Sequence, residues 1–419
     1  MTTTATPTSP SDPPRSLDLP LVSVGMGAVL LAQFLSALAD NAILIAAFAV
    51  NKANGTPQLD GWLQGVFFVP FIVLAPFAGP IADSFPKGRI MLLANLLKLA
   101  GACFMALGGN AVLAYAAVGI GATLYSPAKY GILSQLFRPE HLVRANGMLE
   151  GSTIVAILLG VKLGGWLADR SITWAFPCVV GCYAIATGAN LLIPRLPAEN
   201  RGGGFQPLSM VRRFGTALAG LYRDGDARFS LLGTSVFWGS GSTLRLVLFA
   251  WVPAALLLND NQTPANLMGV LSIGIVLGAV AAGAWISLAR VNRALIGGLL
   301  LGPLILVMAA VTNLRDAALV MAAIGVCGGM FVVPLNALLQ ERGHESVGAG
   351  SALAVQNFSE NLVMLAFVGT YSIVSSAGMP VVQTVAGFGL VLVLAVAAIS
   401  VVRLRGAGAM HKPNERRTS

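Results

Sequence analysis

Charged residues are scarce in this chain. Only 10% of its 419 residues are Asp, Glu, Lys or Arg, whereas a soluble domain carries about 25%. Hydrophobic residues make up 56% of the sequence. Because so few charges cannot cover the surface of a soluble protein of this size, the composition excludes a soluble globular domain and indicates a membrane protein.

Histidine and cysteine are also rare, which removes most enzyme and metal chemistry. The three histidines, His141, His344 and His411, fall in predicted loops or in the C-terminal tail. We find no nucleophile with a neighbouring base, no metal-ligand cluster and no phosphate-binding loop. The four cysteines lie inside predicted helices, so a disulfide framework is not expected. The sequence therefore predicts a protein that is not an enzyme and holds no cofactor.

Long apolar runs dominate what is present. Windows of about 20 apolar residues, long enough to cross a bilayer, begin near residues 22, 61, 88, 111, 144, 171, 226, 265, 293, 315, 347 and 378. The runs are continuous, whereas the strands of a membrane barrel are short segments of alternating hydrophobicity. We expect an all-α membrane protein with twelve transmembrane helices.

A polar stretch in the middle of the chain divides these helices six and six. The expected divisions are a disordered cytosolic tail (1–19), an N-terminal six-helix half (20–193), a cytosolic linker (194–225), a C-terminal six-helix half (226–402) and a second cytosolic tail (403–419).

The net charge of +9 is distributed unevenly between the two sides of the membrane. Most basic residues fall in loops on one side, and the opposite loops offer only Lys52, Arg170 and Arg315. By the positive-inside rule, this asymmetry places both termini in the cytosol. The excess of basic residues is therefore explained by the membrane topology, and we expect no nucleic-acid partner.

Two features resemble the major facilitator superfamily. "YSPAKYGILSQL" from residue 125 has a counterpart in "FVVPLNALLQER" from residue 331, with Pro127 and Pro334 aligned. The stretch "GPIADSFPKGR" resembles the cytosolic loop signature of that superfamily, with its positions filled by Gly79, Asp83, Lys87, Gly88 and Arg89. The resemblance implies two six-helix halves around a central cavity.

The signature loop also suggests a gate. A carboxylate at a helix end can hold the basic groups of a neighbouring helix in one conformation and release them in another. We therefore expect Asp83, Lys87 and Arg89 to act on the conformational equilibrium. Glu150, near the cytosolic end of the fifth helix, is either a further gating residue or a helix-packing partner.

Seven charged residues lie well inside predicted helices: Asp40, Lys98, Lys129, Glu150, Lys162, Arg245 and Glu360. A charge at the bilayer centre costs about 2.5–3.5 kcal/mol, so these side chains must face protein or a wet cavity. Polar neighbours share a helix face with several of them: Gln33 and Ser36 with Asp40; Tyr125 and Ser126 with Lys129; Thr234, Trp238 and Gly241 with Arg245. Asn336 and Gln340 mark the tenth helix in the same way, and helices one, four, seven and ten line the cavity in this superfamily.

Each buried charge also has a structural interpretation. Lys98, on the peripheral third helix, is expected to extend toward the interface or to pair structurally. Lys162 is expected to be an interfacial anchor. For Asp40, Lys129, Arg245 and Glu360 a function is favoured, with structural pairing between helices as the alternative.

Longer stretches closely resemble the bacterial lysophospholipid transporter family. They are "AQFLSALADNA", "YSPAKYGIL", "ARFSLLGTSVFWGSGSTLR", "ADSFPKGR" and "FVVPLNALLQERGHESVGAGSALAVQNFSENL", in a likeness that runs from about residue 22 to residue 400. The resemblance implies flipping of lysophospholipids, chiefly lysophosphatidylethanolamine, from the outer to the inner leaflet of the bacterial inner membrane by alternating access. A separate acyltransferase/acyl carrier protein synthetase would then re-acylate them. The family is sodium-responsive, and Asp40 with Asn41 is the expected cation site.

For such a substrate the residues suggest definite roles. Arg245 is expected to bind the phosphate, because a guanidinium offers a planar bidentate fork, and Lys129 adds a point charge. Asp40 and Glu360 would hold these two bases when the cavity is empty. The expected substrate-binding set is completed by Asn41, Tyr125, Trp238, Asn336 and Gln356.

Two other functions are compatible with the sequence. One is a drug/proton antiporter of the same fold that exports amphiphiles through Asp40. The other is a non-transporting scaffold that docks the acyltransferase through the basic loop 195–228.

Overall fold

The computed structural model describes residues 20–56, 58–137, 139–198 and 206–410, and in these ranges all regular elements are helices. The first seven are α1 (Val24–Ala53), α2 (Leu59–Val73), α3 (Ala75–Ser84), α4 (Lys87–Ala106), α5 (Ala111–Leu136), α6 (Pro139–Arg170) and α7 (Ile172–Asn190). The middle of the chain forms α8 (Pro207–Arg223).

The second set of long helices begins directly after α8. It comprises α9 (Gly225–Trp251) with the π-helical turn η1 (Val252–Leu256), α10 (Gln262–Trp285), the 3₁₀ turn η2 (Leu288–Arg293) with α11 (Ala294–Ala309), α12 (Leu314–Ser346), α13 (Ala349–Ser376) and α14 (Val381–Met410).

One predicted span is broken into two helices. The axes of α2 and α3 differ by 64° across Leu74. Pro76 stands in the first turn of α3. Because proline has no N–H and crowds the preceding turn, it prevents α2 from continuing straight. The expected second helix is therefore a bent pair.

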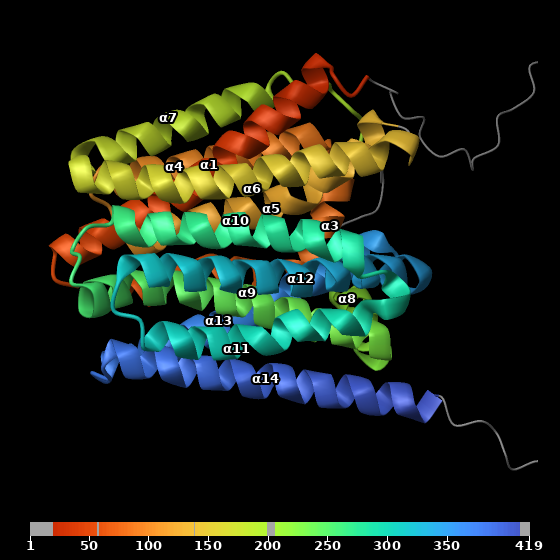
Figure 1. Cartoon of the computed structure of the whole chain (residues 1–419). Coiled ribbons are helices and arrows are strands. Elements are labelled where there is room, and N and C mark those ends of the chain that lie inside the picture. The colour runs from red at the N-terminus through yellow and green to blue at the C-terminus, as the bar shows by residue number, and fades with distance from the viewer. Residues whose placement is uncertain (1–19, 57, 138, 199–205, 411–419) are drawn as a thin grey trace, which may run out of the picture.

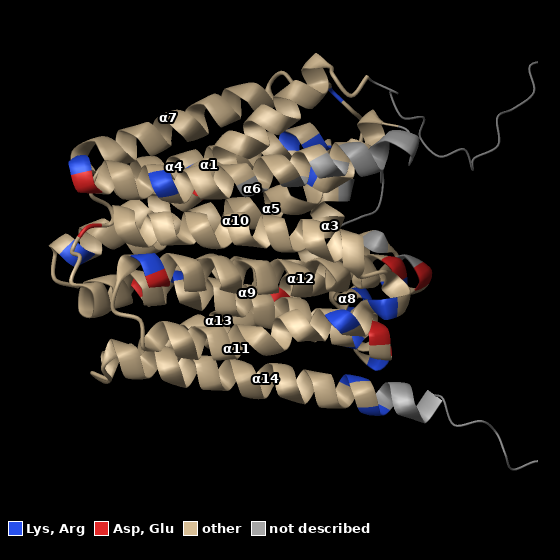
Figure 2. Cartoon of the chain, in the orientation of Figure 1, with Lys and Arg blue, Asp and Glu red and all other residues tan. Residues whose placement is uncertain are grey.

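The expected number of spans is confirmed for the part of the chain that the structure describes. Eleven helices are long and apolar enough to cross a membrane, and the bent pair brings the number to twelve. Figure 2 shows Lys, Arg, Asp and Glu gathered mainly toward the two ends of the bundle, with long uncharged helix lengths between them. This arrangement suits a hydrocarbon layer around the middle of the bundle.

The long helices pack mainly within two sets. In the first set, α1 packs on α6 and α7, and α4 packs on α5. In the second, α10 packs on α12, α9 on α13, and α11 on α14. The sets meet mostly through α2 against α13 and α6 against α10, and Figure 1 shows the helices running nearly parallel from end to end.

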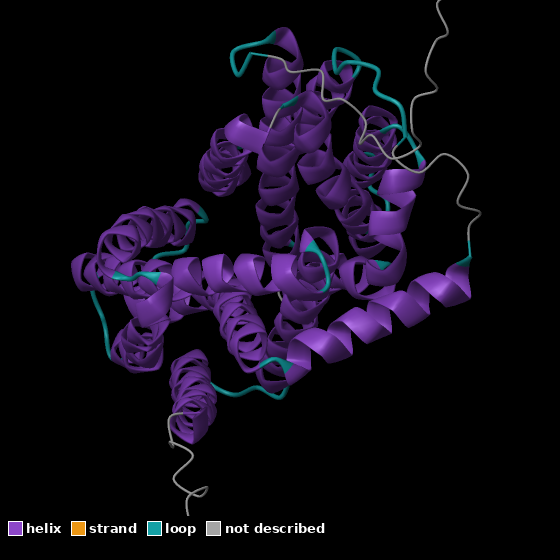
Figure 3. Cartoon of the chain, turned by 90° about the vertical axis from the view of Figure 1, so that its right-hand side faces the viewer, coloured by secondary structure: helices purple, strands orange, loops and turns teal. Residues whose placement is uncertain are grey.

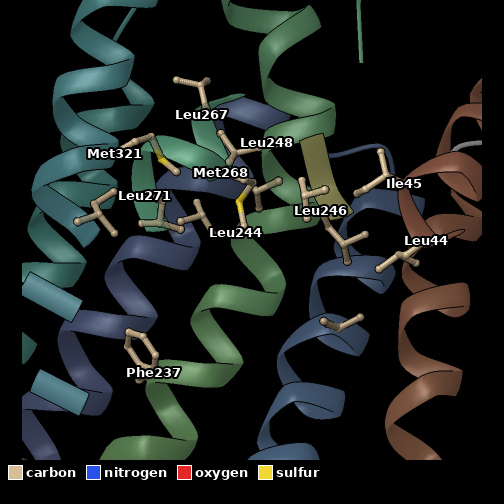
Figure 4. Close-up of a cluster of buried hydrophobic side chains, with 14 of the residues drawn as sticks. Leu44, Ile45, Phe237, Leu244, Leu246, Leu248, Leu267, Met268, Leu271 and Met321 are labelled. Carbon is tan, nitrogen blue, oxygen red and sulfur yellow. The ribbon is translucent and has the colours of Figure 1, made fainter. Parts of the chain in front are cut away.

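A buried hydrophobic cluster crosses the boundary between the two sets. Leu44 and Ile45 of α1 and Leu246 and Leu248 of α9 belong to it, and Figure 4 shows them close to Met268 of α10. An edge contact between the rings of Phe48 and Phe249, with centroids 5.6 Å apart, also joins α1 to the last turns of α9. These two helices carry Asp40 and Arg245.

The middle segment is a helix, although the sequence indicated only a polar linker. On α8, Phe214, Ala217 and Leu221 face the bundle and pack against residues of α9, α12 and α13. The Tyr222 hydroxyl donates a hydrogen bond to Ser359 Oγ at 3.1 Å. Figures 1 and 3 show α8 at one end of the bundle, where it lies across the direction of the long helices.

Candidate functional site

Asp40 lies in the middle of α1 and has two strong partners. Lys98 Nζ of α4 is 2.7 Å from Asp40 Oδ2, and the Tyr183 hydroxyl of α7 donates a hydrogen bond to Oδ1 at 2.6 Å. Lys98 also donates to Ser36 Oγ at 3.0 Å, and Ser36 donates to Asn95 Oδ1 at 2.8 Å. The negative charge of Asp40 is therefore compensated by a residue of the first set of helices.

This network corrects one expectation and decides between the two alternatives given for Lys98. The expected partners of Asp40 were Arg245 and Lys129, and the structure instead pairs Asp40 with Lys98. Of the two expected roles of Lys98, extension toward the membrane interface or structural pairing, the structure shows the pairing, and the side chain is only 2% exposed. A buried charge must be paired or hydrogen-bonded, and in this fold the nearest opposite charge comes from α4.

Helix packing makes room for the buried lysine. A Cβ atom added at Gly121 of α5 would lie 2.6 Å from Lys98 Cγ and 2.7 Å from the Ala94 carbonyl oxygen. Gly121 therefore allows α5 to approach α4 closely while the lysine stem runs between them. Tyr125, one turn further along α5, places its ring 5.4 Å from Lys98 Nζ. Tyr125 thus belongs to the Asp40–Lys98 cluster.

Asn41 does not complete a cation site with Asp40. Its side-chain amide donates a hydrogen bond to the Ala37 carbonyl of its own helix at 2.8 Å. Adjacent residues of a helix point in directions about 100° apart, so the two side chains diverge. The expected Asp40–Asn41 pair is therefore not brought together in this conformation.

Arg245 of α9 faces the first set of helices and forms no ion pair with any carboxylate that the structure describes. It lies near Tyr115 of α5, whose hydroxyl donates a hydrogen bond to the Asp40 backbone oxygen at 3.2 Å. Arg245 Nε is buried and has no hydrogen-bond partner among the described residues. A buried guanidinium with an unsatisfied donor can bind an anion.

Glu360 of α13 sits among amides in the second set. Gln356 Nε2 donates to Glu360 Oε1 and to Asn336 Oδ1, both at 2.8 Å. No Lys or Arg in the described part of the chain forms an ion pair with Glu360, so the expected link to Arg245 is wrong for this conformation. The structure does bring Asn336, Gln356 and Glu360 together, as three members of the expected binding set.

The remaining expected site residues occupy separate positions. Lys129 of α5 is buried, and its Nζ lies 4.6 Å from the centre of the Tyr130 ring. Trp238 of α9 is 41% exposed and makes an edge contact with Phe237. Trp238 and Arg245 lie two turns apart on one face of α9, which gives that face both an aromatic and a cationic group.

The expected gate is described only in part. Asp83 lies in α3 and Glu150 in α6, but both side chains fall outside the described part of the structure. Lys87 is buried at the start of α4, and a Cβ atom added at Gly131 of α5 would lie 2.8 Å from Lys87 Cε. Arg89, two residues further along α4, is exposed.

Polar contacts join the two sets of helices at the end where α1 finishes. The Asp169 carboxylate of α6 accepts hydrogen bonds from Asn261 N at 2.8 Å and from Asn261 Nδ2 at 2.8 Å. Lys52 Nζ donates to the Asn259 carbonyl at 3.2 Å. Deeper inside, Gln64 Nε2 of α2 donates to the Ser242 carbonyl of α9 at 2.8 Å. These contacts hold the two sets closed at this end.

The chain matches the family model of the Major Facilitator Superfamily over residues 29–367. The chain belongs to the major facilitator superfamily. The prolines that aligned in the sequence, Pro127 and Pro334, both lie inside long helices, α5 and α12. Among the described residues, no group of three or more His, Cys, Asp or Glu is placed to hold a metal ion.

Several curated relatives of this major facilitator are named lysophospholipid transporter LplT. The relative from Yersinia enterocolitica is 51% identical over 369 residues, which cover 87% of this chain and 91% of that protein. The relative from an Escherichia coli strain is 49% identical over 383 residues, covering 90% of this chain and 96% of that protein. At this identity and coverage the chain belongs with these transporters, and it is not an enzyme.

Solved structures agree on the fold. A POT family transporter in complex with 5-aminolevulinic acid superposes with a TM-score of 0.74 at 13% identity, covering 91% of this chain and 96% of that chain. A bacterial homologue of the human lysosomal transporter Spinster, in an inward-facing and unoccupied conformation, superposes with a TM-score of 0.65 at 15% identity. The match covers 90% of this chain and 96% of that chain.

The site contains residues that sequence reasoning did not assign. Lys98, Asn95, Tyr115 and Tyr183 surround Asp40, and none of them was in the expected binding set. A signal was present for two of them, because Asn95 and Lys98 are spaced by three residues, as polar neighbours on one helix face are. The tyrosines gave no such signal, since aromatic residues are common in any apolar helix.

Proposed function

We propose that this major facilitator transports lysophospholipids, chiefly lysophosphatidylethanolamine, across the bacterial inner membrane. The proposed direction is from the outer to the inner leaflet, by alternating access, with both termini in the cytosol. A separate acyltransferase/acyl carrier protein synthetase would consume the delivered lipid. The names of the curated relatives support the substrate class.

One observation from the structure carries this proposal, the unsatisfied Nε donor of Arg245. Arg245 Nε is buried and unpartnered among the described residues, although leaving a buried donor without an acceptor costs about 1–3 kcal/mol. A phosphate diester supplies the missing acceptors in a bidentate geometry. Trp238 on the same face offers apolar surface, so this face suits an amphiphile with a phosphate head.

We propose that ion coupling acts through the Asp40–Lys98 pair. Asp40 is already neutralised by Lys98 and held by Tyr183, so a sodium ion at Asp40 must displace the lysine ammonium. A cation that binds only when Lys98 has moved would favour one of the two conformations. Asn41 would join such a site only after its amide leaves the Ala37 carbonyl.

We place the gate at the two ends of the bundle. With both termini in the cytosol, the Asp169–Asn261 contact lies on the outer side and closes it, which is the arrangement of an inward-facing carrier. Asp83, Lys87, Arg89 and Glu150 belong to the opposite, cytosolic end and are proposed to close that end in the alternate state.

Uptake of labelled lysophosphatidylethanolamine by spheroplasts tests the proposal. Spheroplasts that contain the chain should accumulate the lipid in the inner leaflet faster than spheroplasts that lack it, and sodium should raise the rate. Equal rates with and without the chain would contradict lysophospholipid transport. Unchanged lipid uptake together with increased drug sensitivity on loss of the chain would instead support an amphiphile exporter.

A further inference from the structure

The helix α8 carries an exposed face that is both basic and apolar. Its 17 residues include Arg212, Arg213 and Arg223, and no Asp or Glu. All three arginines are exposed, and none of them forms an ion pair with a residue that the structure describes. Leu208 and Val211 are exposed beside them, at 83% and 43%. Cationic groups beside exposed apolar side chains are typical of a helix that lies on a membrane surface.

The apolar arc around α8 is wider than the part that packs on the bundle. Leu221 belongs to the packed side. At about 100° per residue, Val211 lies about 80° round the helix from Leu221, and Leu208 about 60° beyond Val211. Arg212 follows about 40° after Leu208, and Arg223 about 20° after Arg212. The apolar arc therefore leaves the bundle on one flank of α8 and ends at two arginines.

The position of α8 in the fold suits a membrane surface. Figure 3 looks onto the end of the bundle that carries α8 and shows this helix along the outer edge of the molecule. In Figure 2, α8 lies level with the basic residues of α14. These are Arg403 and Arg405, which follow a long uncharged stretch of α14. The helix α8 is therefore at the depth where hydrocarbon gives way to lipid head groups.

The carboxylates that follow α8 in the chain already have partners. Asp224 accepts a hydrogen bond from a backbone N–H of α9 at 2.7 Å. Asp226 forms ion pairs with Arg342, at 2.6 Å, and with Arg403. These carboxylates are taken up inside the protein, so the positive charge of α8 is left for an anion outside it.

We propose that α8 is an interfacial helix that binds anionic phospholipids of the surrounding membrane. Val211 and Leu208 enter the boundary between head groups and acyl chains, and Arg212 and Arg223 contact lipid phosphates. A zwitterionic head group carries no net charge, whereas an anionic head group does, so the arginines favour the anionic lipid. This site is separate from Arg245 and does not depend on the proposed substrate.

Fluorescence quenching by lipids tests the proposal. A bimane label is attached at Leu208→Cys in the full-length protein, after replacement of the four native cysteines. The protein is reconstituted in bilayers of phosphatidylcholine mixed with phosphatidylglycerol. One of the two lipids carries bromine on its acyl chains, and a second sample has the bromine on the other lipid. The quenching by each brominated lipid measures how much of that lipid lies next to the label.

Both brominated lipids should quench the label, and phosphatidylglycerol should be enriched next to it. The expected enrichment over the bulk bilayer is about fivefold, the effect of one arginine near an anionic surface. The triple variant Arg212→Gln, Arg213→Gln and Arg223→Gln should abolish the enrichment, whereas Arg212→Lys, which keeps the charge, should retain it. Arg290→Gln is the matched control and should also retain it, because Arg290 is an exposed arginine of η2, which packs on α11 and α12.

Three results would overturn the proposal. Equal quenching by the two lipids would show that α8 touches the bilayer without selecting anionic lipid. An absence of quenching by either lipid would place α8 in water and leave its basic face to an acidic protein. Enrichment that survives in the triple variant would assign the selectivity to other residues. A label at Val211→Cys provides a second measurement with the same expected results.

Discussion

At the scale of single residues, two buried charges have different surroundings. Asp40 is held by Lys98 and Tyr183 within one set of helices. Arg245 faces the same region from the other set and keeps a donor unsatisfied. The first is therefore an ion pair inside one set of helices, and we propose that sodium or a conformational change opens it. The second is the group that we propose binds the phosphate of the substrate.

Removing Lys98 should destabilise the protein more than removing both members of the pair. Lys98→Met leaves an uncompensated carboxylate, which costs about 3–5 kcal/mol when a buried pair loses one partner. The double variant Asp40→Asn with Lys98→Met leaves no net charge and should recover most of that loss. Thermal unfolding of the purified proteins in detergent measures the stability of the single variant and of the double variant.

The exposed lysine of α6 provides the control for that experiment. Lys162→Met should change the unfolding temperature little, because Lys162 is exposed and the structure shows no ion pair for it among the described residues. Equal effects of Lys98→Met and Lys162→Met would show that the Asp40–Lys98 pair contributes nothing to stability.

Arg245→Lys should impair transport even though the charge is kept. A lysine cannot make the two parallel hydrogen bonds of a guanidinium. Loss of one charge-assisted bond, about 1.5–3 kcal/mol, lowers substrate affinity by about tenfold or more. Initial rates over a range of lysophosphatidylethanolamine concentrations measure the change. Arg212→Lys, on the exposed face of α8, is the control, and wild-type rates in Arg245→Lys would contradict the phosphate role.

At the scale of the helices, the sequence predicted where the spans lie but not which faces meet. Apolar length alone indicated the twelve spans. The partner of Asp40 depended on α4 facing α1, which the pattern of either helix alone cannot show. The helix α8 was missed because its composition is polar, although Phe214, Ala217 and Leu221 recur at helical spacing. Asn336, Gln356 and Glu360 were expected in one binding set; the structure joins them by hydrogen bonds, and their binding role stays a prediction.

Close helix approach around Lys98 gives a prediction at this scale. Gly121→Ala should destabilise the protein by about 1–3 kcal/mol, the usual effect of overpacking, because the added methyl group meets Lys98 Cγ and a backbone oxygen. Gly181→Ala in α7 has open surroundings and should be neutral or stabilising by up to about 1 kcal/mol. If thermal unfolding ranks the two variants in the opposite order, the α4–α5 packing described above is wrong.

At the scale of the whole molecule, two sets of helices are closed against each other at the end where α1 finishes. Hydrogen bonds of Asp169, Asn261 and Lys52 lie at this end, beside the packing of α6 on α10. Hydrogen bonds of this kind can be exchanged for bonds to water, which suits an element with two states. A hydrophobic cluster also joins α1 to the last turns of α9.

Asp169→Ala should shift the carrier toward opening at that end. The variant loses the hydrogen bonds to Asn261, and a loss of about 1.4 kcal/mol changes a two-state ratio about tenfold. Opening can be measured with spin labels at Asn54→Cys and Thr312→Cys, after replacement of the four native cysteines. It would appear as a larger fraction of molecules with a long distance between the two labels. Asp316→Ala is the control, because its hydrogen bonds stay within the first turn of its own helix, and it should leave the distance distribution unchanged. An unchanged distance distribution in Asp169→Ala would show that the Asp169–Asn261 contact does not keep this end closed.

Purified protein in liposomes provides the direct test of the proposal that this chain moves a lysophospholipid between leaflets. Fluorescent lysophosphatidylethanolamine is added to the outside, and dithionite then quenches whatever remains in the outer leaflet. Wild-type protein should create a protected inner pool within the assay, and Arg245→Gln should reduce its rate of formation toward that of protein-free liposomes. A protected pool that forms at the protein-free rate in the presence of wild-type protein would contradict the account.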